Sequence, residues 1–312
     1  MAYLSRKLAH GLLLILGVTL VSFLLMVYYG PDQTYNLLGK NASAEQIQEI
    51  RQQLGYDRTF AARYIDYLHN LFTLQLGSSN SNGEKVTDLL RRSLPISLAL
   101  MLPGFIIGNL LGVALGMLAA WHRNRHLDRL ISAASVTGMS ISFLIVVIVL
   151  QVLLCTPQGL NLFPARGWQV SDLPSYLYYV TVPTLAQVFI TLGYNTRFFR
   201  AVFVEELGRE HIRTARAFGA SPARIMGTHV LKNSLPAMLT RVLFSIPLTI
   251  VTGSLVLETF FGIPGIGKVA FDAMASGDQP VLQAVVALTA VLFVVMQTLA
   301  DLAYRLADPR VA

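Results

Sequence analysis

The sequence predicts an all-α, polytopic membrane protein with six membrane-spanning helices. Of its 312 residues, 54% are hydrophobic and only 13% are charged, whereas soluble domains carry about 25% charged residues. Apolar runs close to the roughly 20 residues that a spanning helix needs also recur along the chain. These runs cover residues 8–28, 96–120, 130–155, 178–199, 237–259 and 281–304.

The first run predicts an uncleaved helix rather than a signal peptide. Arg6 and Lys7 precede it, it is long enough to span, and no small-residue cleavage site follows a short apolar core. Six spans place both ends of the chain on one side of the membrane.

Charge and cysteine content exclude several classes of protein. A net charge of +7 would suggest a nucleic-acid partner in a soluble chain, but in a membrane chain it reflects the basic bias of cytoplasmic loops. We therefore expect no nucleic-acid partner. The single cysteine, Cys155, excludes an internal disulfide and a multi-cysteine metal site.

Basic residues concentrate on one side of the predicted spans. They occupy the N-terminal flank, the loop at 121–129 and the long loop after the fourth run, whereas the opposite loops are nearly balanced in charge. The positive-inside rule places the basic side, and with it both termini, in the cytoplasm. The basic residues are Arg6, Lys7, Arg123, Arg125, Arg129, Arg197, Arg200, Arg209, Arg213, Arg216, Arg224 and Lys232.

A stretch after the fifth run partly matches the sequence motif of a phosphate-binding P-loop. Gly262, Gly267 and Lys268 have the P-loop spacing, but the position that should carry a Mg²⁺-binding hydroxyl is Val269. The stretch also lies on the predicted outer side, away from cytoplasmic ATP. The sequence therefore predicts a tight turn followed by a short helix at 269–275, without bound ATP.

The outer loop at 30–95 is predicted to be helical. Ser43 and Gln46 form a capping box that starts a helix at 46–54, and Gly55 ends it. A second helix is predicted from the apolar face at positions 60, 64, 67, 68 and 71, facing the interface or a neighbouring helix end. A turn-rich break at 77–83 then leads through 84–93 into the second span. The loop is either a structured cap or a docking surface.

The long cytoplasmic loop at 201–236 is the most informative segment. A helix is predicted at 206–218, Gly219 supplies a turn with positive φ, and Ser221-Pro222 start a second, short helix. The surface of this helical pair is small and partly apolar, which is typical of a partner site. The alternative is a helical hairpin that rests on the ends of its own spans.

This segment resembles the coupling loop of ABC-importer permeases, which inserts into a cytoplasmic ATPase. Ala215 and Gly219 fit the general motif; Arg213 replaces its glutamate, and Leu235-Pro236 lie one helical turn later than in sugar importers. Both departures match the oligopeptide/dipeptide branch. Further landmarks of that branch lie at 51–55, 76–78, 94–95, 257–267 and 308–311, whereas Gly30-Pro31-Asp32 departs from its usual Gly-Asp-Pro order.

The resemblance implies the type I ABC permease fold, in a bacterial inner membrane. It divides the chain into a first helix (1–29), a periplasmic helical loop (30–95) and a five-helix core (96–312) that holds the coupling loop (201–236). The implied partners are membrane lipid, a second homologous permease, two ABC ATPases and a periplasmic binding protein that delivers di- or oligopeptides. This chain would be no enzyme and would bind no cofactor, because ATP and Mg²⁺ belong to the ATPases.

The resemblance also implies which residues of the coupling loop (201–236) meet or position the ATPase. They are Glu205, Glu206, Arg213, Ala215, Ala217, Gly219, Ala220, Ser221, Arg224 and His229.

Other functions stay open at this point. An ion-coupled secondary transporter would show acidic residues in its span centres, which this sequence lacks. A membrane enzyme would need a Ser/His/Asp or metal-ligand set, and none can be assembled. Permeases with the same landmarks also carry nickel chelates, glutathione, peptide antibiotics or antimicrobial peptides, so the substrate is not fixed.

Several single residues carry local expectations. Glu258 is an ion site or, more simply, accepts hydrogen bonds from the following glycine-rich turn. Asp301 and Arg305 are spaced for an ion pair. The cytoplasmic histidines show no metal-ligand spacing. Glycines at four-residue steps in the second span indicate close helix packing or a moving contact; they are Gly104, Gly108, Gly112 and Gly116.

Overall fold

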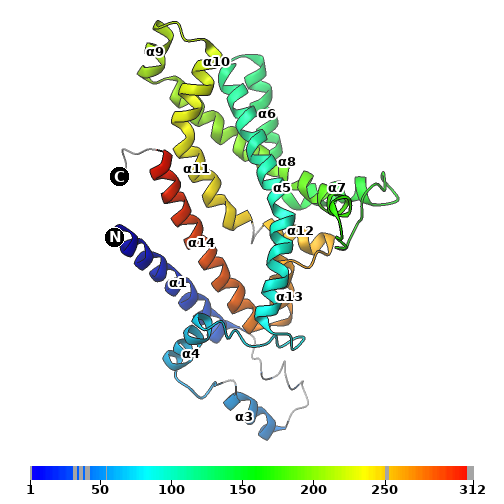
Figure 1. The fold of residues 1–312 in the computed structure, drawn as a ribbon. Helices are drawn as coiled ribbons and strands as arrows, with labels where there is room; N and C mark the ends of the chain where they lie inside the picture. The colour runs from blue at the N-terminus through cyan, green and yellow to red at the C-terminus, as the bar shows by residue number, and fades with distance from the viewer. Residues whose placement is uncertain are drawn as a thin grey trace. The chain divides into compact units, whose positions relative to one another are not determined.

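The computed structural model describes residues 2–30, 34, 38, 43–53, 55–249 and 253–307, and Figure 1 shows it as a ribbon. These residues form helices, with only an isolated antiparallel bridge between Ser78 and Lys85. The helices are α1 (Ala2–Tyr29), α3 (Ala44–Gln53), α4 (Phe60–Phe72), α5 (Val86–Trp121), α6 (His126–Ser140), α7 (Phe143–Cys155), α8 (Leu173–Leu207), α9 (Glu210–Ala217), α10 (Pro222–Arg224), the π-helical η1 (Ile225–Val230), α11 (Leu231–Leu248), α12 (Ser254–Phe261), α13 (Ile266–Ser276) and α14 (Gln279–Ala307).

The helices confirm an all-α, polytopic membrane protein. Among the described residues, α1, α5, α8 and α14 are each long and apolar enough to cross a membrane. Two bent pairs, α6 with α7 and α12 with α13, raise the number of spans to six if each pair counts as one.

The third predicted span is not a single helix. Its residues form α6 and α7, which meet at an angle of 93°. Ile141 and Ser142 adopt extended backbone angles between the two helices, and this interrupts the helical hydrogen bonds. No proline lies at the break, but Gly138, Ser140 and Ser142 interrupt the apolar run around it.

The fifth predicted span, 237–259, covers parts of α11 and α12. α11 ends at Leu248, residues 250–252 lie outside the described part, and α12 begins at Ser254. Gly262 then ends α12 in the left-handed conformation, with φ of +64°, and its N–H donates to the carbonyl of Glu258. α12 and α13 meet at 80°. Gly262, the first glycine of the P-loop-like stretch, is thus a helix cap. The short helix predicted at 269–275 is confirmed within α13.

The chain divides into two compact units. Unit 1 comprises residues 1–96 and 264–295, and unit 2 comprises residues 97–263 and 296–312. The core of unit 1 joins the start of α5 to α13 and α14, through residues such as Val86, Ile266 and Val281. The core of unit 2 joins α8 to the coupling loop and α11. The division at residues 29 and 95 stays a prediction.

Helix α4 of unit 1 packs on α1 through aromatic rings, as the pattern from Phe60 predicted. Phe23 of α1 contacts the rings of Phe60, Tyr64 and Tyr67, with centroids 5.3–5.6 Å apart. Tyr67 also donates to the carbonyl of Gln283 at 3.3 Å. Burial, and secondarily Tyr64, raise the pKa of Tyr67 to about 12, so this donor is protonated at neutral pH.

The predicted local signals around α3 are confirmed. The Ser43 hydroxyl accepts from the Gln46 N–H, while the Gln46 side chain accepts from the Ser43 N–H. Gly55 has φ of +68°. Leu54, the predicted last residue of that helix, lies outside the described residues.

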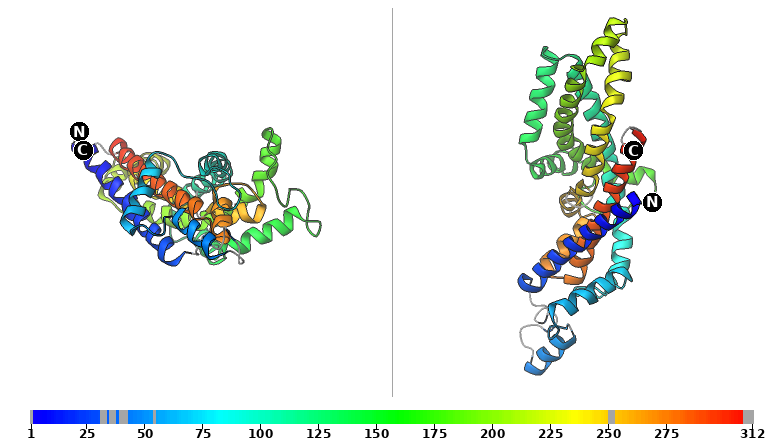
Figure 2. Two further views of the ribbon diagram at one scale, coloured as in Figure 1. Left: turned by 90° about the horizontal axis from the view of Figure 1, so that it is seen from below. Right: turned by 90° about the vertical axis from the view of Figure 1, so that its left-hand side faces the viewer.

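Within unit 2, the predicted glycine stripe (Gly104, Gly108, Gly112, Gly116) faces α8. A Cβ atom at Gly104 would lie 2.3 Å from Gln187 Oε1, and one at Gly116 would lie 2.9 Å from Phe199 Cβ. Side chains at these positions would therefore separate the two helices, which confirms that the stripe serves close packing. α6 and α7 also pack on α8 in this unit, and Figure 2 shows the arrangement from two further sides.

Candidate functional site: the coupling loop

The coupling loop follows a helix–elbow–helix course, with one difference from the prediction. The helix predicted at 206–218 is wrong as a single element, because α8 continues to Leu207 and α9 starts at Glu210. Arg209 adopts an extended conformation between them. This break lets α9 take a direction of its own.

The elbow at Gly219 is confirmed. Its φ is +79°, a conformation that residues with side chains rarely adopt. The N–H groups of Gly219 and Ala220 donate to the carbonyls of Arg216 and Ala215, which satisfies the end of α9. Ser221 caps the next helix by accepting from the Arg224 N–H at 3.3 Å, and Pro222 occupies its first turn.

The second helix of the loop is longer than predicted. α10 continues through the π-helical segment η1 directly into α11. The helix that leaves the elbow is therefore the same continuous rod that forms the following long helix. This continuous course includes the π-helical segment and two prolines inside α11, Pro236 and Pro247.

Ile212 attaches α9 to the rest of unit 2. Its side chain is fully buried and packs in one cluster with Phe199 and Phe203 of α8, Val230 of η1 and Met238 of α11. One face of α9 thus rests on the ends of its own long helices, as the alternative interpretation of the loop expected.

A buried carboxylate strengthens this attachment. Glu206 is 3% exposed, and its oxygens lie 2.9 Å from Arg209 Nε and 3.2 Å from His211 Nε2. His211 Nε2 also lies 3.1 Å from Asn233 Nδ2 of α11, and it accepts from this amide in the tautomer that leaves Nε2 unprotonated. The group of Glu206, Arg209, His211 and Asn233, here called the loop clasp, links α8, α9 and α11.

The opposite face of α9 is exposed. Phe218, directly before the elbow, is 87% exposed, and Ala217 and Gly219 beside it are exposed as well. A Cβ atom at Gly219 would meet no atom within 4 Å, so space does not restrict this position and only its φ does. The tip of the loop is therefore free to meet another surface.

The structure sorts the predicted coupling residues into three groups. Exposed ones are Glu205, Arg213, Ala217, Gly219, Ser221 and Arg224; half-buried ones are Ala215, Ala220 and His229; Glu206 alone is buried. Glu205 makes only a long ion pair of 3.8 Å with Arg209. The role of these residues in ATPase coupling stays a prediction.

The sequence places Ile212 and Phe218 together on the partly apolar surface of the loop without separating them, and it does not single out His211 or Asn233 as site residues. Ile212 and Phe218 look alike in sequence because both are apolar residues of one short segment. The contact of His211 with Glu206 depends on the break at Gly208, and Asn233 is distant in sequence. No local signal could have found the last two.

Other predicted sites are resolved in part. The Ser97 hydroxyl donates to the buried Glu258 carboxylate at 2.5 Å, while the N–H groups of Gly262 and Ile263 donate to the backbone carbonyl of Glu258. The side chain of Arg305, the predicted partner of Asp301, lies outside the described residues. Among described residues, no group of three or more His, Cys, Asp or Glu could hold a metal ion.

These features define a multi-pass membrane protein with an exposed helical loop at 201–236. Residues 112–312 match the family described as binding-protein-dependent transport system inner membrane component, and residues 1–101 match its N-terminal counterpart. The chain belongs to this family, and the predicted permease fold is confirmed.

Similar proteins of known name cover almost the whole chain. The dipeptide transport system permease protein DppB of Bacillus subtilis is 33% identical to this chain, over 95% of this chain and 93% of its own length. The protein of the same name from Lactococcus lactis is 32% identical over 99% of this chain and 98% of its own. The di/tripeptide transport system permease protein DppB of Pseudomonas aeruginosa is 29% identical over 100% and 98%.

Proposed function

We propose that this chain is the permease subunit of an ATP-driven importer of di- or oligopeptides in a bacterial inner membrane. It would form the translocation pathway with a second homologous permease, while two cytoplasmic ABC ATPases bind Mg²⁺ and ATP and a periplasmic binding protein delivers the peptide. The names of the similar permeases support the peptide substrate. The family description supports dependence on a binding protein and an inner-membrane location, and the basic loops support cytoplasmic termini.

The single observation that carries this proposal is Phe218. A large aromatic side chain with 87% exposure stands at the tip of a helix whose other face is fixed by the buried Ile212. Exposed aromatic residues of this kind are typical anchors of protein interfaces, because they fill a pocket on the partner. Arg213, Arg216 and Arg224 are exposed near the tip and would complement acidic residues around such a pocket.

The contacts of the loop also fit the role of a lever. Coupling between an ATPase and a distant transport path needs a rigid element with two discrete positions. The loop clasp (Glu206, Arg209, His211, Asn233) and Ile212 join α9 to both α8 and α11, so a force on Phe218 reaches two long helices at once. Gly219 sets the angle of the elbow, and Gly219→Asp, which strains a positive-φ position, should abolish ATP-driven uptake.

The test compares two exposed apolar residues. Phe218→Ala and the control Leu160→Ala, whose side chain is 65% exposed in the α7–α8 connection, are introduced into the complete transporter. Truncating an interface anchor costs about 2 kcal/mol or more, or roughly 30-fold in affinity. We expect Phe218→Ala to lose co-purifying ATPase and ATP-driven uptake of a labelled dipeptide into vesicles, whereas Leu160→Ala keeps both.

Wild-type uptake and ATPase recovery in Phe218→Ala would contradict the docking role. Uptake driven by an ion gradient, without any ATPase, would instead favour the secondary transporter. ATP-dependent transport that competes with nickel chelates or glutathione but not with dipeptides would keep the importer and change its substrate.

A further inference from the structure

The turn between α5 and α6 carries an unusual concentration of positive charge. Arg123, Arg125, His126 and Arg129, here called the basic turn, are all exposed. Among the described residues, none of its three arginines forms an ion pair with a carboxylate. Their charge is therefore available to a ligand.

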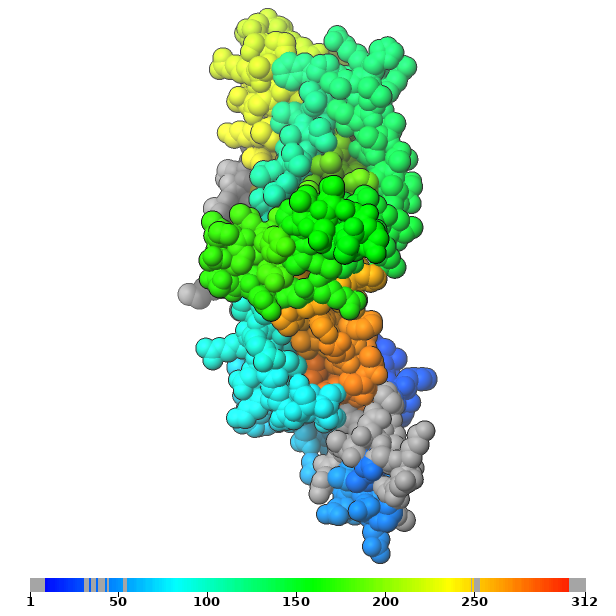
Figure 3. All heavy atoms as spheres, turned by 90° about the vertical axis from the view of Figure 1, so that its right-hand side faces the viewer, coloured from blue at the N-terminus to red at the C-terminus, as the bar shows by residue number. Residues whose placement is uncertain are grey.

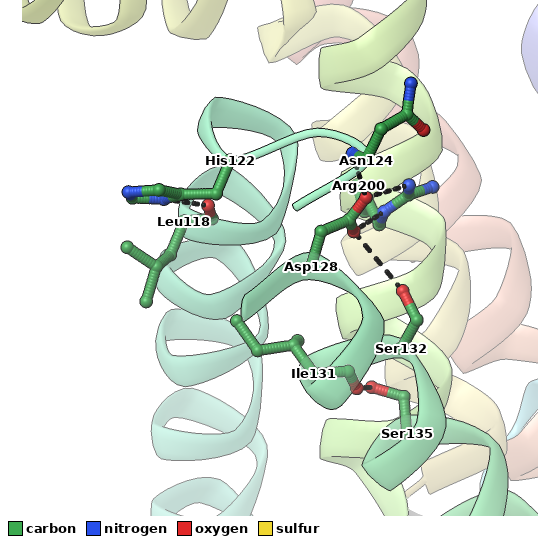
Figure 4. A network of polar contacts seen from close by, with 8 residues as sticks. All are labelled: Leu118, His122, Asn124, Asp128, Ile131, Ser132, Ser135 and Arg200. Carbon is green, nitrogen blue, oxygen red and sulfur yellow. Dashed lines mark hydrogen bonds and ion pairs between the residues drawn. The ribbon is translucent and has the colours of Figure 1, made fainter. Parts of the chain in front are cut away.

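The one carboxylate of this turn is turned inward. Asp128 is 3% exposed, and its two oxygens accept from Arg200 Nε at 2.5 Å and Arg200 Nη2 at 2.7 Å. It also accepts from the Asn124 N–H at 2.9 Å and from the Ser132 hydroxyl at 3.4 Å. Figure 4 shows that Arg200 reaches Asp128 from the neighbouring helix α8. Asp128 is thus neutralised from inside unit 2 and does not offset the charge of the basic turn.

The same contacts fix the shape of the turn. Asn124 has φ of +66°, and its N–H is held by Asp128. The His122 N–H donates to the Leu118 carbonyl, and the Arg125 N–H donates to the His122 carbonyl. The arginines therefore project from a rigid connection between two helices.

Apolar side chains accompany this charge. Trp121 is 45% exposed, Leu127 37% and Leu130 67%. Trp121 is the last residue of the spanning helix α5, and Leu127 and Leu130 lie in the first turns of α6, which belongs to a bent candidate span. A tryptophan at the end of a span, followed at once by arginines, is typical of the level of the lipid headgroups.

We propose that the basic turn binds the phosphate headgroup of an anionic phospholipid. Guanidinium groups pair with phosphate through two parallel hydrogen bonds, and basic clusters directly beside a span attract anionic lipids. The neighbouring Trp121 and Leu130 would contact the glycerol and acyl region of the same lipid. This lipid site does not depend on the proposed transport function.

A soluble protein partner fits this patch less well. Figure 3 shows that the side chains of the α5–α6 turn lie at the same end of unit 2 as those of α9 and α10, where the ATPase is proposed to dock. An ATPase on the basic turn would have to cover Leu130, which is 67% exposed at the start of α6, and would displace lipid from it. A lipid would pair with the arginines through its phosphate and would contact the apolar side chains through its acyl region.

The experiment measures lipid preference on the purified, detergent-solubilised chain. Native mass spectrometry counts bound phosphatidylglycerol and phosphatidylcholine for the wild type, for Arg123→Gln/Arg125→Gln/Arg129→Gln, and for the control Lys85→Gln/Arg91→Gln/Lys232→Gln. The control removes three exposed positive charges elsewhere. Each arginine near a lipid surface contributes roughly five-fold, so the first variant should lose on the order of 100-fold of the preference for phosphatidylglycerol, and the control should keep it.

Any of four results would overturn the proposal. The preference could persist in the basic-turn variant, or fall equally in the control. Inorganic phosphate could displace the lipid at millimolar concentration, which would indicate a site for a soluble anion. The variant could lose co-purifying ATPase with unchanged lipid binding, which would indicate a protein surface. If the triple variant does not fold, Arg129→Gln alone should lower the preference about five-fold.

Discussion

The glycine stripe offers a quantitative test of the helix packing in unit 2. In Gly112→Ala, the new Cβ atom would lie 2.7 Å from Asn195 Cβ, and 3.5 Å from the Asn195 carbonyl carbon and the Thr196 nitrogen. Carbon atoms in contact prefer about 3.5–4.0 Å. Because Asn195 Cβ is attached directly to the backbone of α8, it cannot rotate away, and either α8 or Asn195 must move by about 1 Å.

The expected cost follows from three contributions. Overpacking a closely packed contact costs about 1–3 kcal/mol. A shift of Asn195 also weakens its 2.9 Å hydrogen bond to Asn109 Oδ1, which is buried, and this adds about 1 kcal/mol. Replacing glycine by alanine inside a helix stabilises the helix by up to about 1 kcal/mol, which offsets part of this loss. The sum predicts that Gly112→Ala lowers the free energy of unfolding by about 2 kcal/mol.

Gly138 of α6 provides the matched control, since a Cβ atom there would meet no atom within 4 Å. Gly138→Ala should therefore raise stability by about 0.5–1 kcal/mol through helix propensity alone. Thermal unfolding in detergent should show a Tm about 4–8 °C below the wild type for Gly112→Ala and a few degrees above it for Gly138→Ala. Equal shifts in both variants, or a Gly112→Ala variant as stable as the wild type, would refute the close approach of α5 and α8.

Two further substitutions test buried carboxylates. Glu206→Gln removes the negative charge of the loop clasp, and because the side chains of its partners Arg209 and His211 are half-exposed, we expect a stability loss of only about 1 kcal/mol. We also expect faster proteolysis at 208–219 and several-fold weaker ATP-driven uptake. Unchanged proteolysis and uptake would exclude a positioning role for Glu206. Asp278→Asn weakens two hydrogen bonds to a buried carboxylate, from the Ser79 hydroxyl at 2.5 Å and from the Ser81 N–H at 3.2 Å. This should lower the free energy of unfolding by about 1.5–3 kcal/mol. Amide hydrogen exchange at 77–85 should become faster. Exchange no faster than in Asp272→Asn, which alters an exposed carboxylate paired with Lys268, would count against this contact.

Local chemistry explains what could be predicted from the sequence. The capping box at Ser43 and Gln46, the positive φ of Gly55 and Gly219, and the cap at Ser221 all depend on residues within one or two turns. The glycine stripe was visible because its four-residue period is itself a helical signal. These features are confirmed because no distant contact competes with them.

The missed features depend on contacts between distant segments. The break between α6 and α7 lies inside a predicted span, and both helices pack on α8. The end of α8 near Gly208 lets Ile212 enter the cluster with Phe199 and Met238, and residues so far apart in the chain leave no trace in a local pattern. Helical periodicity reports which faces are apolar but not which partner covers each face.

Ile212 and Phe218 show how far such periodicity reaches in the coupling loop. Six residues at α-helical spacing rotate by about 240° beyond one full turn. Phe218 follows the last residue of α9 as its C-cap, so the packed face that buries Ile212 does not bury Phe218 as well. The sequence cannot say which of them is buried, because both are apolar. The structure buries Ile212 completely and leaves Phe218 87% exposed. Burying a phenylalanine side chain releases about 1.5–3 kcal/mol, and this chain alone does not gain that energy at Phe218. A docked partner would gain it, and because Ile212 holds the other face of the same helix, the energy gained at Phe218 would act directly on α8 and α11.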